Sequence, residues 1–188
     1  HMKYMTHETP LTLEQRQALN EKVLYLIDSD TAETSGITRE DIYNAYTGDG
    51  GLHGLKSSDF ESYHDYSTAK KEIENGQFFT PANICRLVVE SLRLGKSDLV
   101  ADLTCGMGNF FNFLPTEANA YGCEVDAKAF KVARYLYPEA NLALEDIRAY
   151  QPELRFDYVV GNPPFNLRWF TGEEKVLAEC AGAVGAAA

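Results

Sequence analysis

The segment Asn162-Pro163-Pro164-Phe165 carries the most specific chemistry in this sequence of 188 residues. Its two prolines fix the backbone and remove two N–H donors, which leaves carbonyl groups as outward-facing acceptors. A planar exocyclic amine needs acceptors for both hydrogens, so that the nitrogen lone pair can turn toward an electrophile. The side-chain oxygen of Asn162 and the carbonyl of Pro163 suit that role, and Phe165 can stack on a flat ring. A plain turn is the alternative, but the position of the segment directly after a predicted strand favours a site that activates a planar amino group.

A glycine-bearing loop is the second candidate site. Its candidate ligand-binding residues are Asp102, Thr104, Cys105, Gly106 and Gly108. The glycines allow a tight turn and a close approach of the backbone to a ligand. Glu124 follows Gly106 by 18 residues, close to the offset of roughly 20 at which an acidic side chain binds ribose hydroxyls. Phenylalanines and asparagines stand where a dinucleotide site has a third glycine and a long helix, so we expect a nucleoside ligand without a pyrophosphate.

The carboxyl group of Asp146, after the third predicted strand, is a candidate acceptor for an adenine amino group. Ile147 and Val125 would cover the two faces of the adenine ring. The alternative is that Asp146 only caps the segment that follows it. Its place after the glycine loop and Glu124 favours the ligand-binding interpretation.

Four short apolar segments are each typical of a buried parallel strand. They span residues 99–103, 120–124, 141–144 and 156–160. Between the second and third, residues 127–137 have apolar side chains three or four apart, and Pro138 stops the predicted helix. This alternation predicts an α/β sheet with right-handed crossovers. Ligands bind such sheets at the carboxyl ends of the strands, where the glycine loop, Glu124, Asp146 and the Asn-Pro-Pro segment fall.

Helices are also predicted before the sheet. Thr12 and Gln15 form a capping box for a helix over residues 12–27, and Thr38 caps a helix over residues 38–46. A further helix or an ordered connection is expected over residues 59–75. Thr80-Pro81 predicts the start of a helix with a threonine cap that ends at Gly95. Its expected buried stripe consists of Ile84, Leu87, Val88 and Leu92.

The composition disfavours several classes of protein. A hydrophobic content of 45% allows one core with a small helical extension. The formal net charge of -11 disfavours a broad electrostatic grip on phosphates. No apolar run approaches the roughly 20 residues of a membrane span. The four cysteines have no C-x-x-C spacing and no signal peptide precedes them, so reduced thiols in a cytoplasmic protein are expected.

Neither the glycine-rich stretch 48–54 nor the pair His53 and His64 indicates a ligand site. A phosphate-binding loop needs a preceding strand and a following Lys-Ser/Thr, and both are missing from this stretch. The two histidines lack a third ligand for a metal ion. No metal is therefore expected.

In their order along the chain, the motifs resemble those of the gamma-class adenine-N6 DNA methyltransferases, including methylation subunits of type I restriction-modification systems. The resemblance covers roughly residues 76–170. It is carried by Gln77-Phe78-Phe79-Thr80-Pro81, Asp102 to Phe110, Gly122-Cys123-Glu124-Val125-Asp126 and Asn162 to Phe165. It implies a Rossmann-like α/β fold of the S-adenosylmethionine-dependent methyltransferases, here partial, with the first four strands. Three parts are expected: a helical amino-terminal region over residues 1–75, the partial methyltransferase domain over 76–170 and a low-complexity tail over 171–188.

By the same resemblance, S-adenosyl-L-methionine is the cofactor and the substrate is an adenine flipped out of DNA. Phe79 and Thr80 would close over the methionine end of the cofactor, and Glu124 would bind the ribose. Asn162, Pro163 and Phe165 would be the catalytic residues for direct methyl transfer to the amino nitrogen. Asn at the first motif position favours adenine over cytosine-N4, and the absence of a Pro-Cys dipeptide excludes methylation of the cytosine ring.

The family sheet continues beyond a fourth strand and is followed by a target-recognition region. The strands predicted here end at the fourth, so we expect this chain to be inactive alone and to leave an open edge, which favours a homodimer or missing sequence. DNA would be bound largely through other regions, with a specificity or restriction subunit as partner.

Two other functions stay open at this point. Protein glutamine-N5 methyltransferases also combine a helical amino-terminal region with an Asn-Pro-Pro-aromatic segment, because a glutamine amide poses the same hydrogen-bonding problem as adenine. The segment Phe79-Thr80-Pro81, and Phe rather than Tyr at Phe165, favour the DNA-modifying class. The second alternative is a non-catalytic cofactor-binding module of a larger protein.

Overall fold

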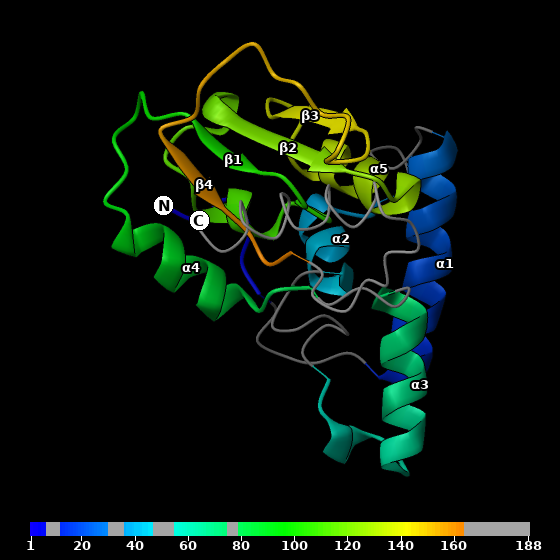
Figure 1. Cartoon of the computed structure of the whole chain (residues 1–188). Coiled ribbons are helices and arrows are strands. Elements are labelled where there is room, and N and C mark those ends of the chain that lie inside the picture. The colour runs from blue at the N-terminus through cyan, green and yellow to red at the C-terminus, as the bar shows by residue number, and fades with distance from the viewer. Residues whose placement is uncertain (7–11, 30–35, 47–54, 75–78, 164–188) are drawn as a thin grey trace, which may run out of the picture.

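Four parallel strands form one sheet at the centre of the computed structural model, which describes residues 1–6, 12–29, 36–46, 55–74 and 79–163 (Figure 1). The strands are β1 (Val100–Asp102), β2 (Ala120–Glu124), β3 (Asn141–Leu144) and β4 (Tyr158–Val160). Their order in the sheet is β3-β2-β1-β4. The chain thus begins in the middle, moves outward through β2 and β3, and returns to the other side of β1. This reversal is the arrangement of a Rossmann-like α/β fold, in which ligands bind beyond the strand ends at the switch point.

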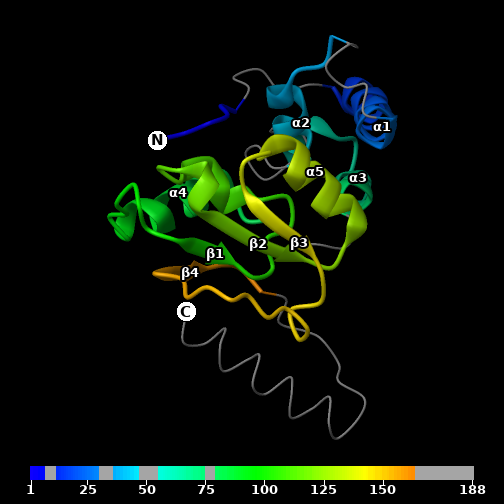
Figure 2. The same cartoon turned by 90° about the horizontal axis from the view of Figure 1, so that it is seen from above.

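The helices lie on one side of the sheet (Figure 2). The α-helices are α1 (Leu13–Ser29), α2 (Arg39–Tyr46), α3 (Tyr63–Glu74), α4 (Ala82–Ser91) and α5 (Ala127–Leu136). Short 3-10 helices are η4 (Ser57–Asp59), η5 (Asn109–Phe113) and η6 (Glu117–Asn119). Helix α5 packs on β2 and β3, and α1 and α2 pack on α5 as an outer layer. The predicted strands and helices are therefore present, with β2 and β3 at the predicted bounds and β1 and β4 shorter.

The helix starts predicted at Thr12 and Thr38 are confirmed. The backbone N–H of Gln15 donates to Thr12 Oγ1 at 3.2 Å, and the Gln15 side chain accepts from the Thr12 N–H at 3.0 Å. Thr38 makes the same reciprocal pair with Asp41, at 3.1 and 3.0 Å. Reciprocal caps of this kind satisfy two donors at the first helical turn.

Helix α4 differs from its prediction in three respects. Pro81 itself occupies the N-cap position and no side chain caps the helix, so the expected Thr80 cap is wrong. The helix ends at Ser91 rather than at Gly95, because Arg93 takes a left-handed φ of 51° that a helix cannot continue through. The buried face is also shifted, since Cys85 and Val89 are buried, whereas Val88 and Leu92 of the predicted stripe are half-buried against the core. Ile84 and Leu87 are 44% and 66% exposed.

One hydrophobic core joins the amino-terminal helices to the sheet. Its buried residues include Tyr4, Val23 and Tyr43 from the amino-terminal part as well as Phe111 and Tyr137 beside the sheet. The boundary predicted at residues 75 and 76 lies outside the described residues, and the division into domains stays a prediction. Packing nevertheless runs across it without a gap in the described core.

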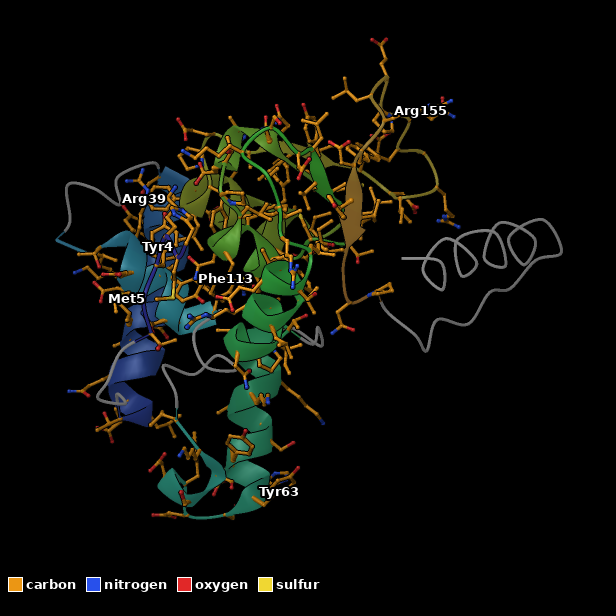
Figure 3. All side chains as sticks on the ribbon, turned by 90° about the vertical axis from the view of Figure 1, so that its left-hand side faces the viewer. Tyr4, Met5, Arg39, Tyr63, Phe113 and Arg155 are labelled. Carbon is orange, nitrogen blue, oxygen red and sulfur yellow. The ribbon has the colours of Figure 1, made fainter. Side chains whose placement is uncertain are left out.

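The segment at residues 3–5 is fixed by a buried asparagine. Asn112 is fully buried and pairs with the backbone of Tyr4, accepting from its N–H at 2.6 Å and donating to its carbonyl at 3.0 Å. The Tyr4 hydroxyl donates to the carbonyl of Leu136, and the Asn44 amide donates to the Met5 carbonyl at 2.9 Å. Tyr4 is consequently buried beside the segment that contains Phe113, whereas Met5 is 61% exposed (Figure 3). Tyr63 is 74% exposed at the far end of α3.

Gly108 has the tightest surroundings of the glycine loop. Its φ is 84°, and a Cβ atom there would lie 2.8 Å from the Tyr137 ring and 2.9 Å from the Phe111 ring. We predict that Gly108→Ala lowers the free energy of unfolding by roughly 2–5 kcal/mol, since a left-handed φ costs roughly 1–2 kcal/mol and overpacking a further 1–3. Urea unfolding of the whole chain measures this.

Gly36→Ala is the matched control, because Gly36 has a similar φ of 78° and nothing within 4 Å of its added Cβ. It should cost only the conformational part, roughly 1–2 kcal/mol. Equal losses for the two variants would show that the contact with Tyr137 does not restrict the loop.

Candidate active site

The loop after β1 is held by the carboxylate of Glu124 at the end of β2. Glu124 Oε2 accepts from the N–H of Gly106 at 2.7 Å, and Oε1 accepts from the N–H groups of Val125 and Asp126 at 3.0 Å each. The residue is 9% exposed. A buried carboxylate needs such donors, and hydrogen bonds to a charged group are about twice as strong as neutral ones. The two predicted ligand-binding elements, the glycine loop and Glu124, are thus brought together.

Asp102 connects this loop to the Asn-Pro-Pro segment. It ends β1 between Gly122 of β2 and Val160 of β4, and its Oδ1 accepts from the N–H of Thr104 at 3.1 Å. A Cβ atom on Gly161 would lie 3.0 Å from the same oxygen. The pKa of Asp102 is raised to about 7, mainly by burial and also by the nearby charge of Glu124, while the hydrogen bond from Thr104 acts in the opposite direction.

The segment ahead of α4 packs against the loop. A Cβ atom on Gly106, whose φ is 56°, would lie 3.7 Å from the ring of Phe79. The amide of Asn109 donates to the carbonyl of Thr80 at 2.7 Å. The structure therefore places Phe79 and Thr80 beside the glycine loop, although 22 residues separate Thr80 from Asp102 in the sequence.

The predicted ring-covering residues differ in exposure. Val125 is 69% exposed, and Ile147 is half-buried. Asp146 forms a salt bridge with Arg148 at 2.7 Å and accepts from the Arg148 N–H at 2.9 Å. These hydrogen bonds to Arg148 lower the pKa of Asp146. Asp146 thus caps a turn at residues 147–149 and not a helix, and its role toward adenine stays a prediction.

Asn162 and Pro163 follow β4 at the same end of the sheet and are exposed. The adjoining Gly161 has Asp102 close by, since an added Cβ on Gly161 would lie 3.0 Å from Asp102 Oδ1, and β4 pairs with β1, which leads into the glycine loop. Pro164 and Phe165 lie outside the described residues, so stacking by Phe165 stays a prediction.

The thiols near the site are buried. Burial raises the pKa of Cys105 well above its ordinary value, and it raises the pKa of Cys123 to about 11. Cys105 instead contributes through its backbone, whose N–H donates to the Cys123 carbonyl at 3.0 Å. Cys85, Cys105 and Cys123 are free thiols. Among the described residues no group of three or more His, Cys, Asp and Glu side chains could hold a metal ion.

Two residues that contribute to the site were not predicted as such. Asn109 was considered only as a replacement for a helix-opening glycine, yet its side chain joins the loop to Thr80. Gly161, between the fourth predicted strand and Asn162, was given no role, and it allows the close approach of the chain to Asp102. The only signal in the sequence was their position beside motif residues.

A parallel sheet with a glycine loop after β1 and a buried acid after β2 defines a Rossmann-like fold of the nucleotide-binding kind. The chain belongs to the N-6 DNA methylase family, whose model matches residues 60–181. It is 27% identical over 109 residues to the type II methyltransferase M.CvrRI of Paramecium bursaria Chlorella virus XZ-6E, covering 56% of this chain and 28% of that protein. It is 29% identical over 129 residues to the methylase subunit of the type I restriction enzyme MjaIX of Methanocaldococcus jannaschii, covering 57% and 23%.

The chain thus spans about a quarter of the length of these two relatives. A solved structure described as a modification subunit of a type I restriction enzyme from Vibrio vulnificus YJ016 is 21% identical, with a TM-score of 0.44, over 64% of this chain and 32% of that one. Among the described residues, no helix has the length and apolar character needed to cross a membrane.

The raised pKa of Asp102 predicts how stability changes with pH. Because the folded state holds this proton up to about pH 7, while an unfolded aspartate releases it near pH 4, stability falls as pH rises between these values. We predict that Asp102→Asn, which keeps an acceptor for the Thr104 N–H, is more stable than the wild type at pH 8 by roughly 1–3 kcal/mol, below the ceiling of about 4 that this pKa sets. The gain should disappear toward pH 4.

Urea unfolding of both proteins at pH 4.5, 6 and 8, without ligand, tests this dependence. A variant that loses stability equally at every pH would show that Asp102 is ionised throughout this range and that its negative charge stabilises the fold.

Proposed function

We propose that this protein transfers a methyl group from S-adenosyl-L-methionine to the N6 amino group of adenine in DNA. The observation that supports the proposal is the close approach of Gly161, which precedes Asn162-Pro163, to the carboxylate of Asp102 at the carboxyl end of β1, ahead of the glycine loop. Family membership supports DNA methylation as the reaction. It also weighs against a protein glutamine as the substrate.

The order of the strands supports an orientation for the cofactor. Val125 and Ile147 lie beyond β2 and β3, Glu124 lies at the end of β2, the glycine loop follows β1, and Asn162 follows β4. A nucleoside with its adenine toward β3 and its ribose at Glu124 would extend its methionine part over the β1 loop. Its sulfonium methyl group would then point toward β4 and Asn162.

The bound cofactor would supply an electrophilic methyl group on a positively charged sulfur. The chain supplies positioning: the Asn162 side-chain oxygen and the Pro163 carbonyl accept the two hydrogens of the target amine. As these hydrogens are held, the nitrogen lone pair would face the methyl group. The N–C bond would form as the S–C bond breaks and the sulfur keeps its electrons, and the methylated nitrogen would release one proton to water. Fixed acceptors of this kind lower the barrier because they need no reorganisation during the reaction.

Recognition of DNA requires more than the described surface. The target base must leave the stack, which costs a few kcal/mol, while the chain has a formal net charge of -11 that opposes tight contact with phosphates. We therefore propose that DNA is gripped and read mainly by other regions or by a specificity subunit, with the protein acting in the cytoplasm.

Replacement of Glu124 should weaken cofactor binding. We predict that Glu124→Gln raises the dissociation constant for S-adenosylmethionine about 10–100-fold, because a hydrogen bond to a charged group contributes roughly 1.5–3 kcal/mol. Glutamine keeps one oxygen as an acceptor for the loop, so the fold should persist. Calorimetric titration of the whole chain measures the change.

Glu139→Gln serves as the control, since Glu139 is exposed just before the amino end of β3, opposite the site. An unchanged affinity of Glu124→Gln for the cofactor would show that the carboxylate of Glu124 does not contribute to cofactor binding.

Replacement of Asn162 should separate chemistry from binding. In a preparation that methylates DNA, Asn162→Ala should lower kcat about 100–1000-fold, the usual effect of losing one fixed polar group at the reacting atom. Affinity for the cofactor should change less than about twofold, because Asn162 would contact the target amine and not the cofactor. Asn162→Asp keeps an acceptor oxygen and should retain more activity than the alanine variant.

Transfer of labelled methyl groups to an adenine-containing duplex, with Asn119→Ala as a control at the amino end of β2, measures the first effect. Equal loss of cofactor binding in Asn162→Ala and Glu124→Gln would contradict the separate roles. Label found in protein and not in DNA would contradict adenine as the substrate and would favour a glutamine amide.

A further inference from the structure

Only one of the two polar groups of the Asn109 side chain has a hydrogen-bond partner in the described part of the structure. It is the first residue of η5, directly after Gly108, and it is 6% exposed. Its Nδ2 donates to the carbonyl of Thr80 at 2.7 Å. Its Oδ1 is buried and has no hydrogen-bond partner in the described part of the structure.

An unpaired buried acceptor is unfavourable and calls for an explanation. Leaving such a group unsatisfied costs about 1–3 kcal/mol, and most buried polar groups in folded proteins are paired. A serine or threonine hydroxyl could donate to a carbonyl such as that of Thr80 without leaving an amide oxygen buried and unpaired. The free oxygen of Asn109 is therefore suited to a donor that arrives with a ligand.

The position of Asn109 indicates which part of a ligand this is. The residue lies where the glycine loop after β1 meets the segment before α4, since Phe79 packs at Gly106 and Thr80 is held by Asn109. Glu124, the acid suited to ribose hydroxyls, lies on the β2 side of the same loop. A nucleoside bound at Glu124 therefore brings its 5′ substituent, and neither its ribose nor its base, toward Asn109.

The chemistry of the amide selects one group of that substituent. The amino-acid tail of S-adenosylmethionine carries an ammonium, with three N–H donors, and a carboxylate that only accepts. An acceptor oxygen fits the ammonium and repels the carboxylate. A hydrogen bond to this charged donor would also offset the cost of the unpaired oxygen.

We propose that Asn109 is a specificity-determining residue, whose Oδ1 binds the ammonium of the cofactor's amino-acid tail while its Nδ2 fixes Thr80. The proposal rests on the proposed cofactor. It assigns to Asn109 the preference for nucleosides that carry an amino-acid tail over those that lack it.

Two nucleosides without a sulfonium charge test this role. S-adenosylhomocysteine has the amino-acid tail, and 5′-methylthioadenosine has the same nucleoside and sulfur but no tail. We predict that Asn109→Leu weakens binding of S-adenosylhomocysteine about 10–100-fold, as expected for a hydrogen bond to a charged donor. Binding of 5′-methylthioadenosine should change less than about threefold.

Two further variants separate the halves of the amide. Asn109→Asp loses the donor to Thr80 but keeps an acceptor, so the preference for the tailed nucleoside should equal or exceed that of the wild type. Asn119→Leu is the matched control, because Asn119 also donates to a backbone carbonyl, that of Lys96 at 2.9 Å, but at the opposite end of β2.

Calorimetric titration of the whole chain gives both dissociation constants. Equal weakening of the two nucleosides in Asn109→Leu would show that Asn109 only supports the loop, and unchanged binding of both would also overturn the proposal. Failure of the wild type to bind either nucleoside would instead reject the proposed cofactor, so the two failures are distinguishable.

Discussion

The carboxylate of Glu124 accepts hydrogen bonds from three backbone N–H groups, and the shape of the candidate site depends on this arrangement. One bond reaches across to Gly106, so the loop after β1 is tied to the end of β2. The other two close the turn at Val125 and Asp126, and Asp126 in turn caps α5 through the N–H of Ala129 at 2.8 Å. A charged acceptor without donors would be costly at this degree of burial. The same contacts that satisfy Glu124 therefore hold the loop in place without a ligand.

Packing behind the loop completes this arrangement. Tyr137, at the end of α5, fills the space beside Gly108, and it also makes an edge contact with Tyr4. The side chain of Asn112, near the end of η5, is fully buried and binds the backbone of Tyr4. It also donates to the Tyr43 hydroxyl at 3.2 Å. The amino-terminal elements thus support the glycine loop from the side away from the strand ends. This accounts for a core that is continuous across the predicted domain boundary.

The sequence was sufficient for elements whose signals are local. The bounds of β2 and β3 follow from short apolar runs, and the caps at Thr12 and Thr38 follow from residues three apart. The buried face of α4 was misjudged because apolar residues occur on adjacent positions of the helix, so two stripes one residue apart were compatible with the pattern. Packing against η5 selects the stripe with the small Cys85 and leaves Leu87 exposed.

The candidate site likewise has residues that could be predicted from the sequence and residues that could not. Glu124 and the glycines could be found from their spacing, which reflects one strand–helix repeat. The contact between Asn109 and Thr80 joins residues 29 apart from two elements with no periodic relation, and only the fold brings them together. The pairing of Asp146 with Arg148 was likewise missed, since an acid two residues before an arginine is compatible with both a cap and a free ligand.

The number of hydrogen bonds at Glu124 has a consequence for ligand binding. A carboxylate offers roughly four lone-pair positions, and three backbone donors already use three of them. A ribose with two free hydroxyls brings two further donors, so one existing bond must lengthen when both hydroxyls bind. The bond to Gly106 is the one that crosses between two elements, whereas those to Val125 and Asp126 lie within one turn. Release of Gly106 would act directly on Phe79, which packs at that glycine, and on the adjoining Thr80, which Asn109 holds. Binding at the ribose end would thereby reach the segment at the other end of the loop through contacts already present in the structure.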